Sequence, residues 1–326
     1  MNKVLHKHIL AALCATPLFL ASSFAQADEA AAPADAAPAA EVAPAVEAAA
    51  AAPAEPAAPY SLTYNLGIYS NYIGRGNDWG DGPALQGGVD WAHTNGFYLG
   101  AWFSTTNPQT LGAAGTVTFE DPSGNPLGSG NHVETDWYGG YTHAFGPVTL
   151  GIGGLYVWYP EGEKSYHNRN QDTFEGNLNI SAYGLTYTFS HAFTDWYGIG
   201  NTRTGGSQNP VLPPSPAEGA ADTSGVEYHE VKYGGALPFA GLNLAAKVGY
   251  QRSDDICLNQ KDYLIGLNRN FSMPTAGKPL DGFNAGFNYT GTFNEEQCSV
   301  NTFYYTDDNG IKINDRKWTF FIKRSW

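Results

Sequence analysis

From Tyr60 to the last residue, apolar and polar side chains alternate with a period of two in segment after segment. In the first of these, residues 61–73, Leu62, Tyr64 and Leu66 alternate with polar residues. Successive side chains of a β-strand point to opposite faces, so each segment predicts a strand with one apolar and one polar face. The composition agrees, because 39 Gly and 20 Tyr stand against only 2 Met, which favours strands and turns over helices. The expected class is all-β.

The alternation predicts about twelve strands. They span residues 61–73, 83–94, 97–106, 133–145, 147–159, 173–182, 185–196, 226–236, 241–252, 261–271, 282–293 and 316–326. Tight turns follow at 94–96, 146–147, 183–184 and 238–240, and they alternate with long polar insertions at 107–132, 160–172, 197–225 and 294–315. The connection at 272–281 is longer than this scheme predicts.

Connections that are short at one end and long at the other are typical of outer-membrane barrels, whose short turns face the periplasm. We therefore expect a transmembrane antiparallel β-barrel of about 12 strands, with ten or fourteen as alternatives and both ends on the periplasmic side. A soluble periplasmic β-protein is the alternative class.

The first 59 residues lie outside this pattern. Residues 1–27 combine a basic start, an apolar run and the motif Ala25-Gln26-Ala27, which together predict a secretory signal peptide. Residues 28–59 are almost entirely Ala, Pro and acidic residues, which predicts a disordered periplasmic tether. The barrel is expected over 60–326, where no stretch approaches the roughly 20 apolar residues of a membrane-spanning helix.

The chain is acidic, with 31 Asp and Glu against 17 Lys and Arg and a net charge of −14. Nucleic-acid binding depends on cations that neutralise phosphates, so this balance argues against a nucleic-acid partner. Beyond the signal peptide the cysteines are Cys257 and Cys298. In an exported protein such a pair predicts a disulfide, here between two neighbouring extracellular loops, and two unpaired thiols are the alternative.

Aromatic residues cluster near the predicted strand ends. They include Tyr69, Tyr72, Trp102, Trp137, Tyr138, Trp158, Tyr159, Trp196, Tyr197 and Trp318. Such rings suit a membrane interface, where one end of the ring is apolar and the other wet, and packing inside a β-protein is the alternative.

The last strand carries a more specific pattern. It places Trp318, Phe320, Ile322 and Trp326 on one face and ends on an aromatic residue. This pattern resembles the C-terminal signal that directs outer-membrane barrels to the barrel assembly machinery. Arg324 departs from it by placing a cation on the outward face.

Three motifs near the start of the barrel region are distinctive in their order and spacing. They are Ser70-Asn71-Tyr72-Ile73-Gly74-Arg75-Gly76, Pro83-Ala84-Leu85-Gln86-Gly87-Gly88-Val89-Asp90-Trp91 and Gly96-Phe97-Tyr98-Leu99-Gly100-Ala101-Trp102. Their order resembles the opening of the TorF-like family of proposed outer-membrane porins, a conserved proteobacterial family of unknown function. The resemblance extends over 60–326 and implies an outer-membrane β-barrel and a pore in a Gram-negative bacterium, but no particular solute.

If the apolar faces contact lipid, the polar faces line the lumen. The charged pore-lining candidates are Asp90, Glu134, Asp136, Glu175, Lys247, Asp262 and Lys323. An acidic wall attracts cations, so we expect weak cation selectivity, and mutual pairing of these charges is the alternative. Arg75 is a further candidate, either at a constriction or facing an anionic sugar of lipopolysaccharide, although its flanking glycines also fit a simple turn. For the strand at 226–236, the sequence does not decide which face lines the lumen.

No arrangement of residues predicts catalysis. Ser190 and His191 are adjacent on one predicted strand, so their side chains point to opposite faces and form no nucleophile–base pair. The His and acidic residues show no metal-ligand spacing, and we expect neither a metal nor a cofactor.

The expected function is therefore a porin-like channel for passive or weakly cation-selective diffusion of small solutes. Its expected partners are outer-membrane lipids, lipopolysaccharide, the barrel assembly machinery and the solutes themselves. The alternatives are a non-conducting surface protein that binds a partner or glycan through its long loops and, less favoured, an outer-membrane hydrolase.

Overall fold

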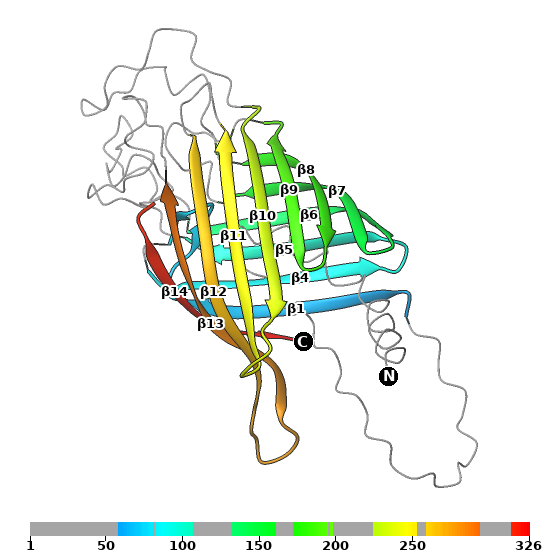
Figure 1. Cartoon of the computed structure of the whole chain (residues 1–326), viewed down its shortest axis with the longest axis vertical. Coiled ribbons are helices and arrows are strands. Elements are labelled where there is room, and N and C mark those ends of the chain that lie inside the picture. Colours follow the sequence, from blue (N-terminus) through cyan, green and yellow to red (C-terminus); the bar gives the residue numbers. More distant parts are fainter. Residues whose placement is uncertain are drawn as a thin grey trace, which may run out of the picture.

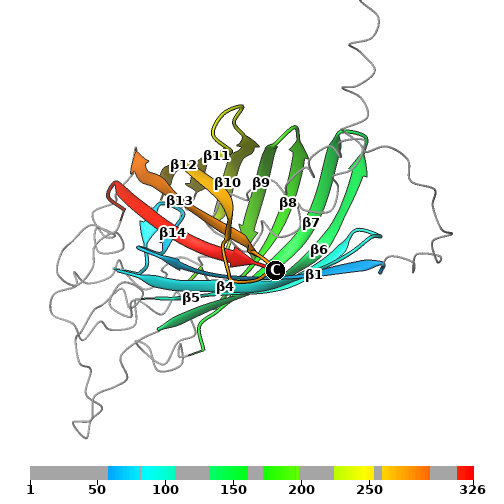
Figure 2. The same cartoon turned by 90° about the horizontal axis from the view of Figure 1, so that it is seen from below.

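The computed structural model describes residues 58–80, 82–106, 132–160, 172–194, 196–197, 224–252, 259–293 and 314–326. Within these ranges the chain forms a closed antiparallel barrel of twelve strands and one small separate hairpin (Figures 1 and 2). The barrel strands are β1 (Tyr60–Tyr69), β4 (Ala84–His93), β5 (Phe97–Thr105), β6 (Val133–Phe145), β7 (Val148–Trp158), β8 (Thr173–Ala182), β9 (Leu185–Ala192), β10 (Glu227–Ala236), β11 (Leu242–Arg252), β12 (Gln260–Met273), β13 (Leu280–Phe293) and β14 (Lys317–Ser325). The hairpin consists of β2 (Ile73–Gly74) and β3 (Asn77–Asp78). In the described residues no helix is long and apolar enough to cross a membrane.

The barrel closes where its first and last strands meet. β1 pairs with β14 from Asn65 opposite Ser325 to Tyr69 opposite Phe321, and every other barrel strand pairs with its sequence neighbours. Closure gives β1 a partner on both sides along Asn65–Tyr69, so the sheet has no free edge along this stretch. The prediction of an all-β barrel with twelve strands is confirmed, and the alternatives of ten and fourteen are wrong.

Both ends of the barrel region lie beside the short turns, as the alternation predicted. The backbone N–H of Thr94, in the turn between β4 and β5, donates to the carbonyl of Pro59 at 2.8 Å. A short turn of the same kind joins β8 to β9, where Tyr183 and Gly184 have φ values of 54° and 82°. Two successive residues with positive φ form the turn that matches the twist of paired strands.

The connection between β12 and β13 is shorter than the sequence pattern suggested. Both strands extend past the predicted limits, and a bulge at Phe271 and Met273 carries their pairing on to Met273 opposite Leu280. The hydroxyl of Thr275 donates to the carbonyl of Lys278 at 2.8 Å across the remaining turn. The result is a hairpin that projects beyond its neighbours at the short-turn end (Figure 1).

Apolar side chains cover the outside of the barrel, and polar side chains fill the inside. Large apolar residues exposed on the outer face include Leu62, Leu66, Ile68, Leu99, Ile152, Leu178, Ile180, Val248, Ile265 and Phe320. Buried inside are polar residues such as Gln86, Ser104, Asn177, Asn179, Asn243, Gln251, Asn268, Asn288 and Thr290. This distribution is the reverse of that in a soluble β-protein, whose core is apolar.

The side of β10 that the sequence left open is also defined. Tyr228 is buried and Glu230 and Lys232 are largely covered, whereas Val231 and Tyr233, which alternate with them, are exposed. Glu230 and Lys232 therefore face the lumen.

The aromatic residues near strand ends divide between the two faces, which corrects the expectation that all of them suit the membrane interface. Trp137, Trp158 and Trp318 are exposed on the outside. Buried inside are Tyr69, Tyr72, Trp102, Tyr138, Tyr159 and Trp196. Neighbouring residues of a strand point to opposite faces, so an aromatic pair such as Trp137 and Tyr138 cannot lie on one side.

The first strand is shorter than predicted, because β1 ends at Tyr69 rather than at residue 73. Arg75 and Gly76 have φ values of 49° and 82°, which turn the chain sharply between β2 and β3. The signal peptide at 1–27, nearly all of the linker at 28–59, the four long insertions apart from their edges, Cys257 and Cys298 lie outside the described residues.

Candidate functional site

Residues 70–83, called here the inserted hairpin, connect β1 to β4 and contain β2 and β3. Instead of staying at the rim, the hairpin folds into the barrel, where its side chains reach strands on several sides of the wall. Three groups of contacts hold it there.

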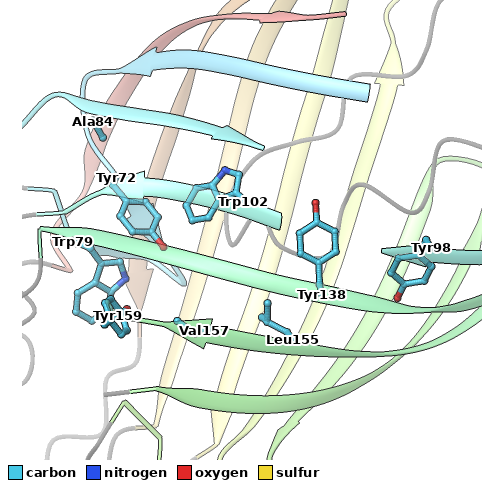
Figure 3. Packing of buried hydrophobic residues seen from close by; sticks show 9 residues of the cluster. All are labelled: Tyr72, Trp79, Ala84, Tyr98, Trp102, Tyr138, Leu155, Val157 and Tyr159. Atoms are coloured by element: carbon cyan, nitrogen blue, oxygen red, sulfur yellow. The ribbon is translucent and has the colours of Figure 1, made fainter. Parts of the chain in front are cut away.

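The first group is aromatic and lies against β5, β6 and β7. Tyr72 and Trp79 join an internal cluster with Trp102, Val157 and Tyr159 (Figure 3). The rings of Tyr72 and Trp102 have centroids 5.5 Å apart. This aromatic patch on the inner wall gives the hairpin a surface on which to pack.

The same side of the hairpin makes a buried hydrogen bond to the wall. The hydroxyl of Tyr72 donates to Oε1 of Glu134 at 2.6 Å, and the hydroxyl of Tyr159 donates to Oε2. Burial and the nearby Glu134 carboxylate raise the pKa of Tyr72 well above its usual range, so its hydroxyl remains a donor. Glu134 is thus an anchor for the hairpin.

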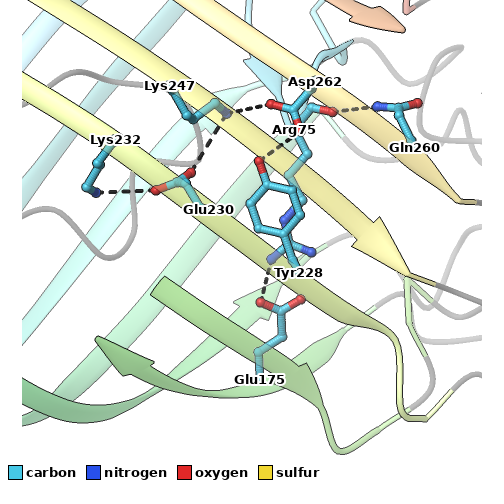
Figure 4. A network of polar contacts seen from close by, with 8 residues as sticks. All are labelled: Arg75, Glu175, Tyr228, Glu230, Lys232, Lys247, Gln260 and Asp262. Carbon is cyan, nitrogen blue, oxygen red and sulfur yellow. Dashed lines mark hydrogen bonds and ion pairs between the residues drawn. The ribbon is translucent and has the colours of Figure 1, made fainter. Parts of the chain in front are cut away.

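The second group lies at the tip of the hairpin (Figure 4). The guanidinium of Arg75 donates to Glu175 of β8 at 2.6 Å and lies 4.4 Å from the ring centroid of Tyr228 of β10. The amide of Gln260, at the start of β12, donates to the carbonyl of Arg75 at 2.6 Å. Burial disfavours the charged guanidinium, but the Glu175 carboxylate, together with Tyr197 and Tyr228, raises the pKa of Arg75 above its usual range. Arg75 therefore stays a cation.

The third group connects the hairpin to the start of β14. Nζ of Lys317, at the start of β14, lies 2.6 Å from Oδ2 of the buried Asp78. The backbone N–H of Gly80 donates to Oδ1 of the same carboxylate at 3.1 Å. With anchors on β6, β8, β12 and β14, the hairpin crosses the lumen from one wall to the other.

The lumen wall has two arcs of different charge. Along β4 to β8, the charged side chains of the described residues that face inward are all carboxylates: Asp90, Glu134, Asp136 and Glu175. Along β10 to β14 they include four cations: Lys232, Lys247, Lys317 and Lys323. The ring order places these arcs opposite each other, so an electric field runs across the lumen.

Within the second arc, Lys232 is paired with a carboxylate of its own strand and Lys247 with carboxylates of the two neighbouring strands. Nζ of Lys247 lies 3.1 Å from Asp262 and 3.9 Å from Glu230, and Nζ of Lys232 lies 3.6 Å from Glu230 (Figure 4). In the first arc, Asp90 accepts a hydrogen bond from the hydroxyl of Tyr138. No hydrogen-bond partner of Oδ1 of Asp136 is found in the described part of the chain.

A cavity lies between the inserted hairpin and the wall of β6 to β11. Its polar lining comprises Arg75, Asn77, Glu134, Asp136, Glu175, Asn177, Thr188, Ser190, Glu230, Lys232 and Gln251. Aromatic side chains complete it: Tyr72, Trp79, Trp196, Tyr197 and Tyr228.

The structure brings Arg75, Glu134, Asp136 and Glu175 together at this cavity, with Lys247 and Asp262 close by. Asp90 and Lys323 face the lumen nearer the short-turn end. Sequence reasoning missed Tyr72 and Asp78 as anchors, and it also missed Lys317. These contacts join residues up to 239 positions apart, which no local pattern encodes.

The aromatic residues of the C-terminal pattern lie outward. Trp318, Phe320, Ile322 and Trp326 are exposed on the outer face. The guanidinium of Arg324 lies 5.4 Å from the ring centroid of Phe283 and 5.5 Å from that of Trp326, so the outward cation stacks on aromatic rings at the rim.

The remaining candidates for chemistry do not meet in one place. Ser190 is buried on the inside, whereas His191 lies outside beside Glu227, its Nδ1 3.8 Å from the carboxylate. Among the described residues no group of three or more His, Cys, Asp or Glu could hold a metal ion.

The chain was compared with protein families and with solved structures. Residues 53–326 match the model of a family described as "bacterial protein of unknown function (Gcw_chp)". The chain belongs to this family. The TorF-like name is not among the matches, and a comparison with curated proteins gives no match.

Among solved structures, this Gcw_chp member is similar to the KdgM porin, with 7% identity and a TM-score of 0.41 over 81% of this chain and 99% of that one. It is also similar to the NanC porin, with 10% identity and a TM-score of 0.38 over 82% and 99% of the two chains. A third is OccK5 of Pseudomonas aeruginosa, with 10% identity and a TM-score of 0.35 over 81% and 67%. The closed ring of paired strands, rather than these distant likenesses, defines the fold.

Proposed function

We propose that this Gcw_chp protein is an outer-membrane channel for small solutes that is weakly cation-selective and narrowed by the inserted hairpin. The apolar outer face supports the membrane location, because soluble proteins rarely expose a continuous apolar surface of this kind. The outward aromatic face of β14 supports recognition by the barrel assembly machinery. The apolar outer face supports contact with outer-membrane lipids, lipopolysaccharide included.

The observation that carries the proposal is the charged hairpin anchored across a polar lumen. A barrel of this size leaves a modest lumen once side chains fill it. A segment bonded to opposite walls narrows that lumen further, as constriction segments do in channels.

The direction of selectivity follows from the charges. In the described lumen and hairpin, seven carboxylates face five cations, so the passage is acidic on balance: Asp78, Asp90, Glu134, Asp136, Glu175, Glu230 and Asp262 against Arg75, Lys232, Lys247, Lys317 and Lys323. An acidic passage with low-dielectric walls concentrates cations.

The test is conductance of the full chain, purified in detergent and inserted into a planar bilayer under a KCl gradient. We expect discrete steps and a reversal potential of the sign that indicates cation preference. A folded barrel that never conducts would overturn the channel and favour surface binding through the long loops. Conduction with anion preference would overturn the proposed selectivity while leaving the channel in place.

A further inference from the structure

The cavity beside the inserted hairpin holds more carboxylates than its own cations neutralise. Its charged lining comprises Glu134, Asp136, Glu175 and Glu230 against Arg75 and Lys232. The carboxylates outnumber the cations by two, and they lie where the hairpin narrows the lumen.

Among these carboxylates, Asp136 is both buried and incompletely hydrogen-bonded. Its side chain is 3% exposed, and Oδ1 has no hydrogen-bond partner among the described residues. The same holds for Oδ1 of Asn177, whose side chain also lines the cavity and is 6% exposed. Buried polar atoms in native proteins are paired with protein, water or a ligand. The unpaired Oδ1 of Asp136 therefore calls for a donor in the cavity.

The walls of the cavity indicate which donor fits. Trp196 and Tyr197 present rings to the cavity beside its carboxylates. Arg75 already shows how such a surface holds a cation, because its guanidinium lies between the carboxylate of Glu175, at 2.6 Å, and the ring of Tyr228, at 4.4 Å (Figure 4). A planar organic cation can donate to carboxylates and stack on aromatic rings at once. A bare metal ion needs several oxygen ligands in one shell, and no such group occurs in the described residues.

We propose that the cavity is a binding site for a small organic cation with a guanidinium or primary ammonium head, which donates to Asp136. Arg75 occupies the adjacent end of the cavity and completes one side of the site. The inference deepens the proposed channel, because a cation would reach the cavity through the lumen. A small organic cation is then the class of solute that we expect to be held at the constriction.

Calorimetric titration of the full chain in detergent tests this site. The probe is methylguanidinium, and methylurea is its uncharged counterpart of nearly the same shape. We expect saturable binding of methylguanidinium and none of methylurea. Asp136→Asn should weaken the binding by about tenfold or more, as for loss of a charge-assisted hydrogen bond. Absence of saturable binding to the wild-type chain would overturn the site, as would equal binding of methylurea.

Asp90→Asn is the matched control, because it removes the same charge from the lumen but not from the cavity lining. We expect it to leave the affinity unchanged, and an equal loss in both variants would show a diffuse effect of lumen charge instead. Should Asp136→Asn fail to fold, Tyr197→Leu removes an aromatic ring of the cavity lining and must weaken binding for the site to stand. Calorimetry needs no conduction, so its failure leaves the channel intact, and a non-conducting barrel leaves the binding result valid.

Discussion

At the scale of single residues, Gly76 sets how closely the inserted hairpin approaches the wall. Its φ of +82° strains any other residue, and a Cβ atom there would lie 2.8 Å from Cβ of Asp262 and 2.8 Å from Cγ2 of Thr292. We expect Gly76→Ala to loosen the tip and raise single-channel conductance, since the left-handed conformation alone costs about 1–2 kcal/mol per residue. Gly146→Ala is the control, because Gly146 has a φ of +63° with nothing within 4 Å. Equal conductance changes in both variants would contradict this role of the tip.

We expect Tyr72 to hold the inserted hairpin through its hydroxyl group. Tyr72→Phe removes a buried donor to Glu134, and a hydrogen bond to a charged group contributes about 1.5–3 kcal/mol. Hydrogen exchange of the hairpin amides, including that of Trp79, should therefore accelerate by roughly 10- to 100-fold. Tyr156→Phe is the matched change, because Tyr156 donates to Asp172 at 2.6 Å on the exposed side. If hydrogen exchange of the hairpin amides is unchanged in Tyr72→Phe, packing of the ring alone is enough to hold the hairpin.

At the scale of elements, the inserted hairpin is separable from the barrel. Tyr69 of β1 lies opposite Ala84 of β4, so the pairing of the two strands is complete before the hairpin begins. Replacing residues 70–83 by Asn-Gly would join the strands through a two-residue turn of the favoured type. We expect a folded barrel with larger conductance and weaker ion selectivity, measured in planar bilayers. If this variant folds and conducts like the wild type, the hairpin does not lie in the conduction pathway.

The strands themselves were predictable, because the period-two pattern is local. All twelve lie within four residues of their predicted limits. The two largest differences are at the ends of β1 and β9, and the one at β1 is itself the start of the hairpin. The fate of Gly74-Arg75-Gly76 was not predictable, because a turn signal is the same at a rim and in a lumen. What draws this turn inward is Glu175, Gln260 and the wall around them, which lie 100 and 185 residues further along the chain.

At the scale of the whole molecule, the outer face should tolerate charge only near its edges. Ile152 lies midway along β7 and is 59% exposed, whereas Phe145 ends β6 at the short-turn rim. Ile152→Lys should destabilise the barrel by about 2–4 kcal/mol and Phe145→Lys by about 0–1 kcal/mol, measured by urea unfolding in lipid vesicles. Similar losses at both positions would contradict a lipid-facing band centred on the strands.

The two charged arcs make a second prediction for the molecule as a whole. Asp90→Asn removes charge from the acidic arc, and Lys323→Gln removes it from the opposite arc. We expect reversal potentials to shift in opposite directions, toward weaker cation preference in the first and stronger in the second. Shifts of the same sign would show that one arc does not face the permeating ions.

The sequence separation of the hairpin and its anchors bears on the order in which contacts form as the barrel folds. The hairpin follows the first strand, but its partners on β8, β12 and β14 come 100, 185 and 239 residues later. Contacts between such distant parts of a chain form late, because the intervening segments must be placed first. The pairing that closes the ring begins with Asn65 opposite Ser325, which lie 260 positions apart, farther than the residues joined by any of these anchors. We therefore expect the hairpin to meet β6 and β8 before the ring closes, so that the passage is already narrowed when the barrel is complete.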